Sequence, residues 1–373
     1  MDDFLIITCV HHSGQDGKYF AYGPYVREMN LWIENEKTVA VVAPLIKDQL
    51  PGKIDLAYNH GRLKYINVPA YHVQNIKAIF KALIDLPGII FQIAKAMKKA
   101  KHIHIRIPGN MGLLAMFVQI FFPGKPKTIK YAGNWDVNSK QPKTYKIQRF
   151  IANSPFLTKN AKVLVYGDWP DSSKNVISFF TASYKEEEIA EVKKNPISKK
   201  LKLVFVGALY DGKNPEIGIK LSKFLMDANV NFEFTYCGDG VMRKELEEES
   251  RNLGLEQHVK FLGNVDANKV KETLMDSHFL IFVSETEGWP KAVAEAMFWG
   301  CVPFTSKVSC VPQMVGEDRE RGVLVPKDPK EIFRELMEVI RNESEFERMS
   351  QAAIAWARTF TLEKFQTEIQ KLK

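Results

Sequence analysis

Short runs of β-branched residues alternate with helical patterns along all 373 residues, and this alternation constrains the fold more than any other feature. Strands are predicted in the first half at residues 4–10, 38–43, 102–107, 128–131 and 162–165. Helices are predicted between them at residues 28–34, 73–86, 89–99 and 112–122. Strands that alternate with helices favour a parallel sheet covered on both faces, so the expected fold class is α/β.

The alternation starts again after residues 193–200, a polar, basic stretch with a proline that is typical of a linker. Strands of the second half are predicted at residues 203–206, 231–237, 259–262, 279–283 and 302–305. Its last helices are predicted at residues 329–342, 345–359 and 362–372. The chain is therefore expected to form two doubly wound domains that join near residue 190, with a ligand between the carboxyl ends of their strands.

The net charge of +8 favours an anionic partner, and the candidates are a nucleotide diphosphate, an acidic membrane leaflet and nucleic acid. No nucleic-acid-binding motif is present, so nucleic acid is not expected as a partner. The four cysteines are widely spaced without a Cys-x-x-Cys pair, which favours free thiols and no zinc site. Because neither a signal peptide nor a sufficiently long apolar run is found, a cytoplasmic protein without a membrane-spanning helix is expected.

Two glutamates stand out in the second half. Glu287 lies on the loop after the predicted strand at residues 279–283, and Pro290 suits the first turn of a helix predicted at residues 291–300. Glu295 lies within that helix among apolar residues, where a carboxylate needs a hydrogen-bonding partner. The hydroxyls of a ribose would serve, and so would a lysine; in that alternative Glu287 is an ordinary solvated residue.

The start of this helix also suits an anion. The backbone amides of Trp289, Lys291 and Ala292 have no partner within the helix, so they favour a phosphate or a sugar oxygen. Lys291 itself is either a ligand of that anion or a surface lysine.

Glu287 and Glu295, seven residues apart and followed by Ala-Met-x-x-Gly-x-x-Pro, resemble the E-x7-E signature of retaining glycosyltransferase family 4. The segments at residues 205–214, 237–240, 259–263, 311–312, 322–325 and 361–365 resemble further motifs of this family in the same order. The resemblance covers residues 200–373 well and the first half only in architecture. In this family the first glutamate contacts the donor sugar and the second contacts the ribose.

The resemblance implies a GT-B fold, in which two Rossmann-like domains face each other across a cleft. The expected divisions are an acceptor-side domain at residues 1–190, a nucleotide-sugar domain at residues 191–360, and a helix at residues 361–373 that crosses back. The implied reaction moves a sugar, with retention, from a UDP- or GDP-linked donor to a saccharide or lipid-linked acceptor in glycan or polysaccharide synthesis. The implied donor-binding segments include Gly207, Gly288, Trp289 and Pro290.

One departure from the family concerns the diphosphate. The family binds it with an arginine and a lysine, whereas this chain keeps Lys213 but has Ala208 in place of the arginine. A charge-assisted phosphate contact contributes about 1.5–3 kcal/mol, so another residue should compensate. Lys291 and Arg106 are the candidates, although Arg106 is equally suited to a structural salt bridge. A second departure is that Ser309 and Cys310 replace a Gly-Gly pair.

The first half offers less specific signals. Gly14, in the segment at residues 11–17, loosely fits the glycine-rich loop that the family directs at the phosphates, but an ordinary turn explains it nearly as well. Asn134 and Asp136 follow a predicted strand and are candidate sugar-binding residues on the acceptor side. A helix with four lysines suits peripheral contact with an anionic membrane, or it simply packs on the sheet: Lys95, Lys98, Lys99 and Lys101.

The expected mechanism stabilises a leaving diphosphate with Lys213, helix amides and either Lys291 or Arg106, while Glu287 holds the sugar hydroxyls. The chain lacks an Asp-x-Asp motif, so neither a metal nor any cofactor besides the donor is expected. Paired carboxylates beside a phosphate-binding helix start argue against a glycoside hydrolase. A nucleotide-sugar epimerase and a catalytically silent sugar-nucleotide-binding protein remain as alternatives.

Overall fold

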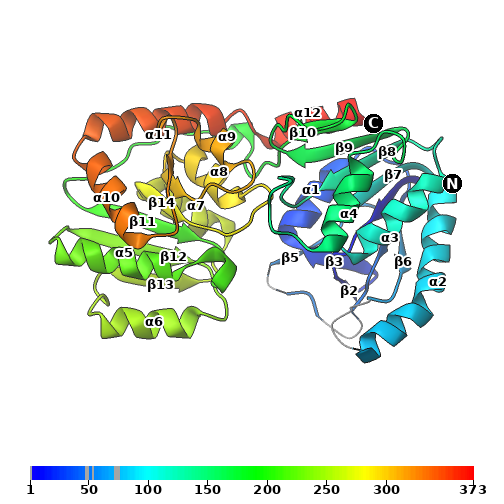
Figure 1. Cartoon of the computed structure of the whole chain (residues 1–373), viewed down its shortest axis with the longest axis horizontal. Helices are drawn as coiled ribbons and strands as arrows, with labels where there is room; N and C mark the ends of the chain where they lie inside the picture. The colour runs from blue at the N-terminus through cyan, green and yellow to red at the C-terminus, as the bar shows by residue number, and fades with distance from the viewer. Residues whose placement is uncertain (1, 47–49, 53, 71–75) are drawn as a thin grey trace. The chain divides into compact units, whose positions relative to one another are not determined.

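The computed structural model describes residues 2–46, 50–52, 54–70 and 76–373 (Figure 1). The chain forms two compact units, Met1–Phe180 together with Gln366–Lys373, and Thr181–Phe365. Each unit contains a parallel sheet with helices, which confirms the predicted two-domain α/β fold. The segment at residues 181–190 clusters with the second unit, and the last eight residues cluster with the first. The domain limits given above and the cleft implied by the resemblance stay predictions.

The first unit is built on a seven-stranded parallel sheet in the order β10-β9-β8-β7-β1-β4-β6. Its strands are β1 (Asp2–Ile7), β4 (Val39–Ala43), β6 (Leu63–Asn67), β7 (Ala100–Ile107), β8 (Lys127–Tyr131), β9 (Ala161–Tyr166) and β10 (Val176–Phe179). Successive strands are added in one direction from β1 to β6 and in the other from β7 to β10. The order therefore reverses between β1 and β7, where a doubly wound sheet opens a crevice at its carboxyl edge.

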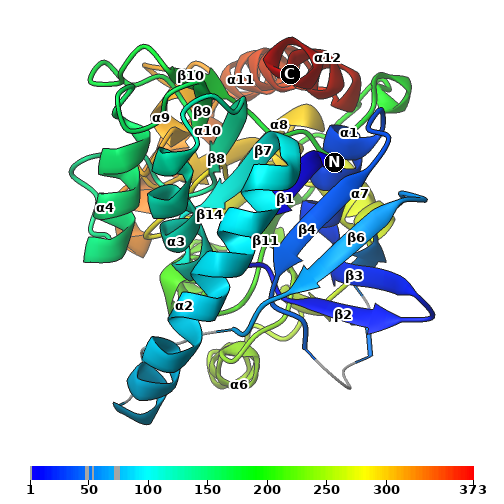
Figure 2. The same cartoon turned by 90° about the vertical axis from the view of Figure 1, so that its right-hand side faces the viewer.

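The helices of the first unit are α1 (Gly23–Ile33), α2 (Ile76–Lys99), α3 (Asn110–Val118), the 3₁₀ turn η1 (Gln119–Phe121), α4 (Lys143–Ala152) and the last part of α12 (Leu362–Leu372). Figure 2 shows α2, α3 and α4 side by side, with α2 and α3 packed on the sheet. The sequence predicted two helices interrupted near Pro87, whereas α2 continues through this proline. Residues 73–75 of that prediction lie outside the described residues.

A small antiparallel sheet joins β2 (His12–Gln15), β3 (Lys18–Tyr22) and β5 (Asp55–Ala57). The segment predicted to be a glycine-rich loop is therefore a β-hairpin, in which Gly14 lies in β2 opposite Tyr19. Its turn is formed by Asp16 and Gly17, whose φ angles of 51° and 73° are those of the tight turns that suit hairpins. Gly14 itself lies in a strand, so the predicted glycine-rich loop is replaced by the alternative of an ordinary turn, at Asp16 and Gly17, and phosphate binding by Gly14 stays a prediction.

The second unit contains a six-stranded parallel sheet in the order β13-β12-β11-β14-β15-β16. Its strands are β11 (Leu201–Val206), β12 (Phe232–Cys237), β13 (Val259–Gly263), β14 (Phe279–Phe282), β15 (Val302–Thr305) and β16 (Val323–Leu324). Numbered within the unit, this order is 3-2-1-4-5-6, that of a nucleotide-binding doubly wound domain. Every residue of β14 is buried, so both faces of the sheet are covered at its centre.

The helices of the second unit are η2 (Glu186–Glu188), η3 (Asp211–Lys213), α5 (Glu216–Asp227), α6 (Arg243–Asn252), α7 (Ala267–Asp276), α8 (Lys291–Phe298), α9 (Val311–Val315), α10 (Pro329–Ile340), α11 (Glu343–Ala357) and the first part of α12. Helix α5 contacts α6 and α10, while α8 contacts α7 and α11. The strand order reverses between β11 and β14, so the loops after these two strands are the natural place for a ligand.

Candidate functional site

The loops after β11 and β14 bring two predicted site residues together. Lys213 ends η3, Glu287 lies on the loop before α8, and the Lys213 Nζ forms an ion pair with Glu287 Oε1. Their side chains are only 16% and 10% exposed, and the ammonium lies 4.9 Å from the centre of the Phe282 ring. The pair thus occupies the point where the strand order reverses, which is the expected ligand position in this type of sheet.

A set of hydrogen bonds holds the two loops against each other. The Asn214 Nδ2 donates to the Val283 carbonyl at 2.7 Å, and the Glu285 amide donates to the Gly212 carbonyl at 3.0 Å. Asn214 is buried and has a left-handed backbone with a φ of 47°, a conformation that asparagine tolerates better than most residues. The sequence analysis did not identify Asn214 as a positioning residue, although an asparagine directly after a glycine-containing turn is a usable signal.

The loop before α8 is fixed from two sides. The Gly288 carbonyl accepts hydrogen bonds from Ser309 Oγ at 2.9 Å and from Cys310 Sγ at 3.4 Å. The two residues that replace the family's glycine pair therefore bind the loop through their side chains. On the other side, the Trp289 ring stacks on Trp356 with a centroid distance of 6.1 Å. These contacts position the loop, and the direct role of Gly288 and Trp289 in donor binding stays a prediction.

Helix α8 begins at Lys291, with Pro290 as its N-terminal cap. The Pro290 carbonyl accepts the Val293 amide at 3.0 Å, the first hydrogen bond of the helix. The first amides of a helix have no partner within it, so a helix start is a favourable place for an anion. The structure thus confirms the predicted helix start beside Glu287, while the part played by Lys291 stays a prediction.

Glu295 is partly buried in the middle of α8. Its Oε1 accepts a hydrogen bond from Ser183 Oγ at 2.5 Å. The ring of the neighbouring residue, Tyr184, packs on Phe298. The pKa of the Tyr184 phenol is raised, mainly by burial and to a smaller extent by the negative charge of Glu295. The sequence analysis missed Ser183, because no local pattern shows that a residue 112 positions away contacts α8.

Three glycines allow the loops after β11 and β12 to approach closely. Gly207 and Gly238 have φ angles of 155° and 151°, and a Cβ on Gly238 would lie 1.8 Å from the Gly207 carbonyl oxygen. A Cβ on Gly240 would lie 2.2 Å from the Leu209 carbonyl oxygen. Ala208, which stands where the family has arginine, is exposed between these contacts. The backbone around the missing arginine is therefore fixed, and Gly207 is required here for conformation whatever its role in binding.

Arg106, the second candidate for the missing charge, lies in β7 of the first unit. Its Nη1 is 3.9 Å from Glu28 Oε1, and its guanidinium lies over the Tyr25 ring at 5.2 Å. Burial opposes the charge on Arg106, but Glu28, Tyr166, Tyr25 and Cys9 together outweigh burial, so the pKa of the guanidinium is raised. This geometry favours the salt-bridge alternative, and a contact of Arg106 with the diphosphate stays a prediction.

The remaining first-unit candidates lie in structured loops. Asn134, which follows β8, is buried, and its Oδ1 accepts the Asp136 amide at 2.9 Å. Its carbonyl also accepts a hydrogen bond from Gln141 Nε2. Asn134 thus shapes the turn that presents Asp136, and sugar binding by either residue stays a prediction.

Two histidines of the first unit, His12 and His104, are buried, and His102 is partly buried. Burial lowers the pKa of His12 and of His102 to about 4, and it lowers the pKa of His104 well below its ordinary value. The His12 Nδ1 donates to the Val10 carbonyl at 2.8 Å, and its Nε2 lies 2.9 Å from the Tyr58 hydroxyl.

The stability of the first unit should therefore fall in acid. Below pH 6.5 these histidines are protonated in the unfolded chain but not in the folded chain. The free energy of unfolding therefore decreases as the pH falls from about 6.5 to about 4. Each histidine contributes at most about 1.4 kcal/mol per pH unit in this window. Urea midpoints measured at intervals from pH 7 to pH 5 should fall, and His12→Gln should reduce the slope. Equal midpoints across this range would contradict the buried neutral state.

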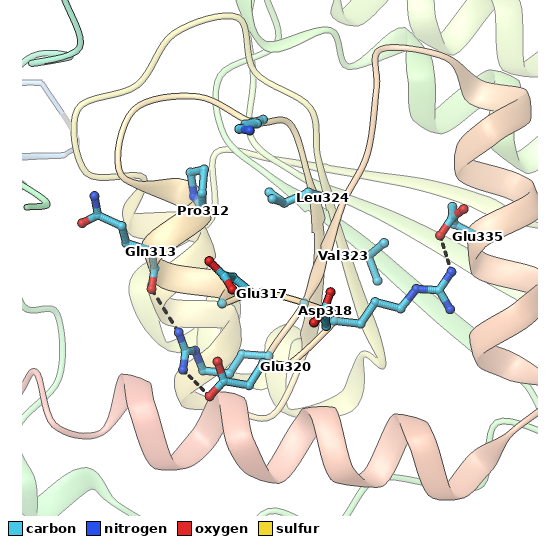
Figure 3. A pocket seen from close by; sticks show the side chains of 13 residues that line it. Pro312, Gln313, Glu317, Asp318, Glu320, Val323, Leu324 and Glu335 are labelled. Carbon is cyan, nitrogen blue, oxygen red and sulfur yellow. Dashed lines mark hydrogen bonds and ion pairs between the residues drawn. The ribbon is translucent and has the colours of Figure 1, made fainter. Parts of the chain in front are cut away.

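The second unit also contains a pocket of about 790 Å³ between α9, β16 and α10 (Figure 3). Its arginines are engaged by neighbouring groups: Arg319 pairs with Glu335, and Arg321 pairs with Glu320 at 2.6 Å and donates to the Gln313 carbonyl at 3.0 Å. The lining also carries four carboxylates, those of Glu317, Asp318, Glu320 and Glu335, against three cationic side chains, so we do not place the diphosphate in this pocket.

No group of three or more His, Cys, Asp or Glu side chains in the described part of the chain is arranged to hold a metal ion. None of the helices in that part combines the length and the apolar character needed to cross a bilayer. Metal independence stays a prediction.

Comparison with known sequences gives a family for the second half. Residues 186–356 match the family model described as glycosyl transferases group 1. A Campylobacter jejuni enzyme that extends an undecaprenol-linked saccharide, an alpha-1,4-N-acetyl-D-galactosaminyltransferase, is 29% identical over 39% of this chain and 40% of its own. The Staphylococcus aureus capsular polysaccharide biosynthesis glycosyltransferase CapH is 27% identical over 39% of this chain and 42% of its own. The chain thus matches about two-fifths of the length of these curated relatives.

Comparison with solved structures covers both halves. Anabaena HepE, solved with UDP and glucose, aligns over 100% of this chain and 99% of its own, with 15% identity and a TM-score of 0.67. The lipopolysaccharide outer core galactosyltransferase WaaB aligns over the same shares, with 16% identity and a TM-score of 0.67. At these identities the likeness establishes the fold, which is that of the GT-B proteins.

Proposed function

Because residues 186–356 match the glycosyl transferases group 1, we propose that the chain moves a sugar from a nucleotide-diphosphate sugar to a saccharide or lipid-linked acceptor. The chemistry takes place with retention, in the synthesis of a glycan or polysaccharide. The observation that supports this proposal best is the Lys213–Glu287 ion pair at the strand-order reversal, directly before the start of α8. A cation, a carboxylate and outward-facing helix amides are the groups that a sugar diphosphate needs.

The pair suggests how the site accommodates the donor. Without a donor, Glu287 neutralises Lys213 in a largely buried position, where a lone charge would be strongly unfavourable. When the diphosphate binds, Lys213 transfers its contact to the phosphate oxygens, and Glu287 is released to accept hydrogen bonds from the donor sugar. The leaving diphosphate is then stabilised by Lys213 and the α8 amides as the sugar–phosphate bond breaks.

Glu295 provides the ribose contact in this proposal. Its Oε1 binds Ser183, and a carboxylate accepts several hydrogen bonds at once, so it can also accept one from a ribose hydroxyl. The relatives named above are glycosyltransferases, which does not favour an epimerase. A silent sugar-nucleotide-binding protein would share the binding site and differ only in turnover.

Removal of the Glu295 carboxylate should weaken nucleotide binding. A charged hydrogen bond contributes about 1.5–3 kcal/mol, so Glu295→Ala should raise the Kd for the cognate nucleotide diphosphate about 10- to 100-fold. Calorimetric titration of the purified protein measures this change. Ser183→Ala is the matched control, since it removes the neighbour of Glu295 and keeps the carboxylate, and it should change the Kd much less. Equal binding by wild type and Glu295→Ala would refute the ribose assignment.

A donor screen tests the proposal as a whole. The thermal midpoint of the protein is measured with UDP-, GDP- and ADP-sugars, and the released nucleotide diphosphate is quantified for each donor. We expect one base to raise the midpoint and the same donor to be turned over. A raised midpoint without turnover of any donor, in the presence of saccharide and lipid-linked acceptors, would instead identify the silent protein.

A further inference from the structure

Positive charge is concentrated in one part of the first unit. Residues 56–160 contain 17 lysines and arginines but only two acidic residues, Asp85 and Asp136, whereas the whole chain has a net charge of +8. The rest of the chain is therefore net negative. This segment forms α2, α3, η1 and α4, which lie side by side in Figure 2.

Large aromatic side chains are exposed in the same region. Phe121 at the end of η1 and Phe156 after α4 are 82% and 78% exposed. Phe117 in α3 and Phe150 in α4 are exposed as well. Scattered exposed apolar residues are ordinary, but four exposed phenylalanines on neighbouring segments need an explanation.

Hydrogen bonds show that these segments are neighbours. The Gln119 Nε2 of η1 donates to the Leu157 carbonyl at 2.8 Å, which places Phe121 and Phe156 on adjoining turns. The Lys125 Nζ donates to the Lys98 carbonyl at 3.1 Å, which joins the end of α2 to the turn after η1. The Lys127 Nζ binds the Lys159 carbonyl at 2.6 Å. These turns precede β7, β8 and β9, so they meet at the amino edge of the parallel sheet.

We infer that this surface, formed by Phe117, Phe121, Phe150, Phe156, Lys98 and Lys159, docks the protein on an anionic lipid bilayer. Exposed rings surrounded by lysines suit the boundary between acyl chains and headgroups, where rings insert and ammonium groups bind phosphates. The Lys159 Nζ lies 5.7 Å from the centre of the Phe156 ring, so the two types of group are interleaved. A second copy of the chain is disfavoured as the partner, because two copies docked through this surface would bring their like charges together.

The inference changes the sequence-based expectation and goes beyond the proposed function. The sequence placed the membrane contact on four lysines of one helix, but Lys101 lies in β7 and forms an ion pair with Asp3 at 2.6 Å. The surface lies at the amino edge of the sheet, whereas the crevice of this unit opens at the carboxyl edge. Docking therefore leaves the carboxyl edge accessible.

Vesicle sedimentation of the full chain tests the inference. We expect the chain to sediment with phosphatidylcholine vesicles that contain about 30 mol% phosphatidylglycerol, and not with phosphatidylcholine alone. Phe121→Ser with Phe156→Ser should weaken partitioning about tenfold or more, since the inserted apolar surface is lost. Val241→Ser, at a 90% exposed apolar position of the second unit, is the matched control and should bind like wild type.

A charge reversal gives a second route that does not depend on the phenylalanines. Lys98→Glu with Lys159→Glu should abolish binding to anionic vesicles, while Lys244→Glu with Lys330→Glu makes the same change of net charge on the second unit and should preserve it. Thermal midpoints and donor binding, measured without vesicles, establish that each variant is folded and separate this test from that of the proposed function. Absence of binding to anionic vesicles, or equal loss in the variants and their controls, would overturn the inference. The inference would also be overturned if the chain bound an RNA oligonucleotide rather than vesicles and if the same variants weakened that RNA binding.

Discussion

Glu287→Gln is expected to lower kcat about 100- to 1000-fold, the range observed when one preorganised electrostatic contact to a transition state is removed. The substitution keeps the shape of the side chain and removes its charge. Lys213 then loses its counter-ion in a largely buried position, while the sugar loses the carboxylate that accepts its hydroxyls. Because the ribose and diphosphate contacts remain, the KM for the donor should change much less than kcat. Steady-state kinetics with the cognate donor measure both values.

The neighbouring Glu285 supplies the control for this experiment. It lies on the same loop, is exposed, and pairs with Lys327 at 2.7 Å. Glu285→Gln makes the same chemical change two residues away and should leave kcat close to that of wild type. If both variants lose activity equally, the effect arises from the loop and not from the carboxylate of Glu287.

Gly238→Ala is expected to destabilise the second unit by about 4 kcal/mol or more, which places it among the exceptional single substitutions. The added Cβ would lie 1.8 Å from the Gly207 carbonyl oxygen, and the φ of 151° disfavours any side chain. Backbone atoms on both sides prevent relief by a simple rotamer change. The loops after β11 and β12 must therefore separate, which also displaces the loop that leads to Lys213. Urea unfolding followed by tryptophan fluorescence measures the loss of stability.

Gly254→Ala is the matched control for this prediction. Gly254 belongs to the same unit and has a φ of 70°, but its Cβ would have open space within 4 Å. Only the left-handed backbone is then unfavourable, at about 1–2 kcal/mol. A loss of stability in Gly238→Ala no greater than in Gly254→Ala would show that the two loops do not approach as closely as described.

The elements that the sequence predicted best are those with a strong local pattern. The central strands of both sheets are long buried runs, and the predicted start of α8 rests on a proline next to a strand-ending loop, so all of these are confirmed. The helix break at Pro87 was wrong because α2 tolerates a proline within its length. The strand at Gly14 was missed because its partner β3 is held on the other side by β5, a segment far along the chain that no local pattern shows.

In the candidate site, too, the sequence predicted what depends on local pattern and missed what depends on contacts between distant segments. The glutamate spacing placed Glu287 and Glu295 on the correct loop and helix from local sequence alone. The contacts that position them, from Asn214 and Ser183, cross between segments far apart in the chain, so no local pattern contains them. The sequence could not decide between a ligand role and a salt bridge for Arg106, because that choice depends on the placement of Glu28.

Turnover of nucleotide-sugar donors by wild type and by Glu287→Gln is the most direct test of the central claim that sugar transfer takes place at this site. Released UDP or GDP is measured for each donor with a mixture of saccharide and lipid-linked acceptors. We predict that wild type releases the nucleotide from one donor. Glu287→Gln should release it at least about 100-fold more slowly. An unchanged rate in Glu287→Gln would contradict this account of the site.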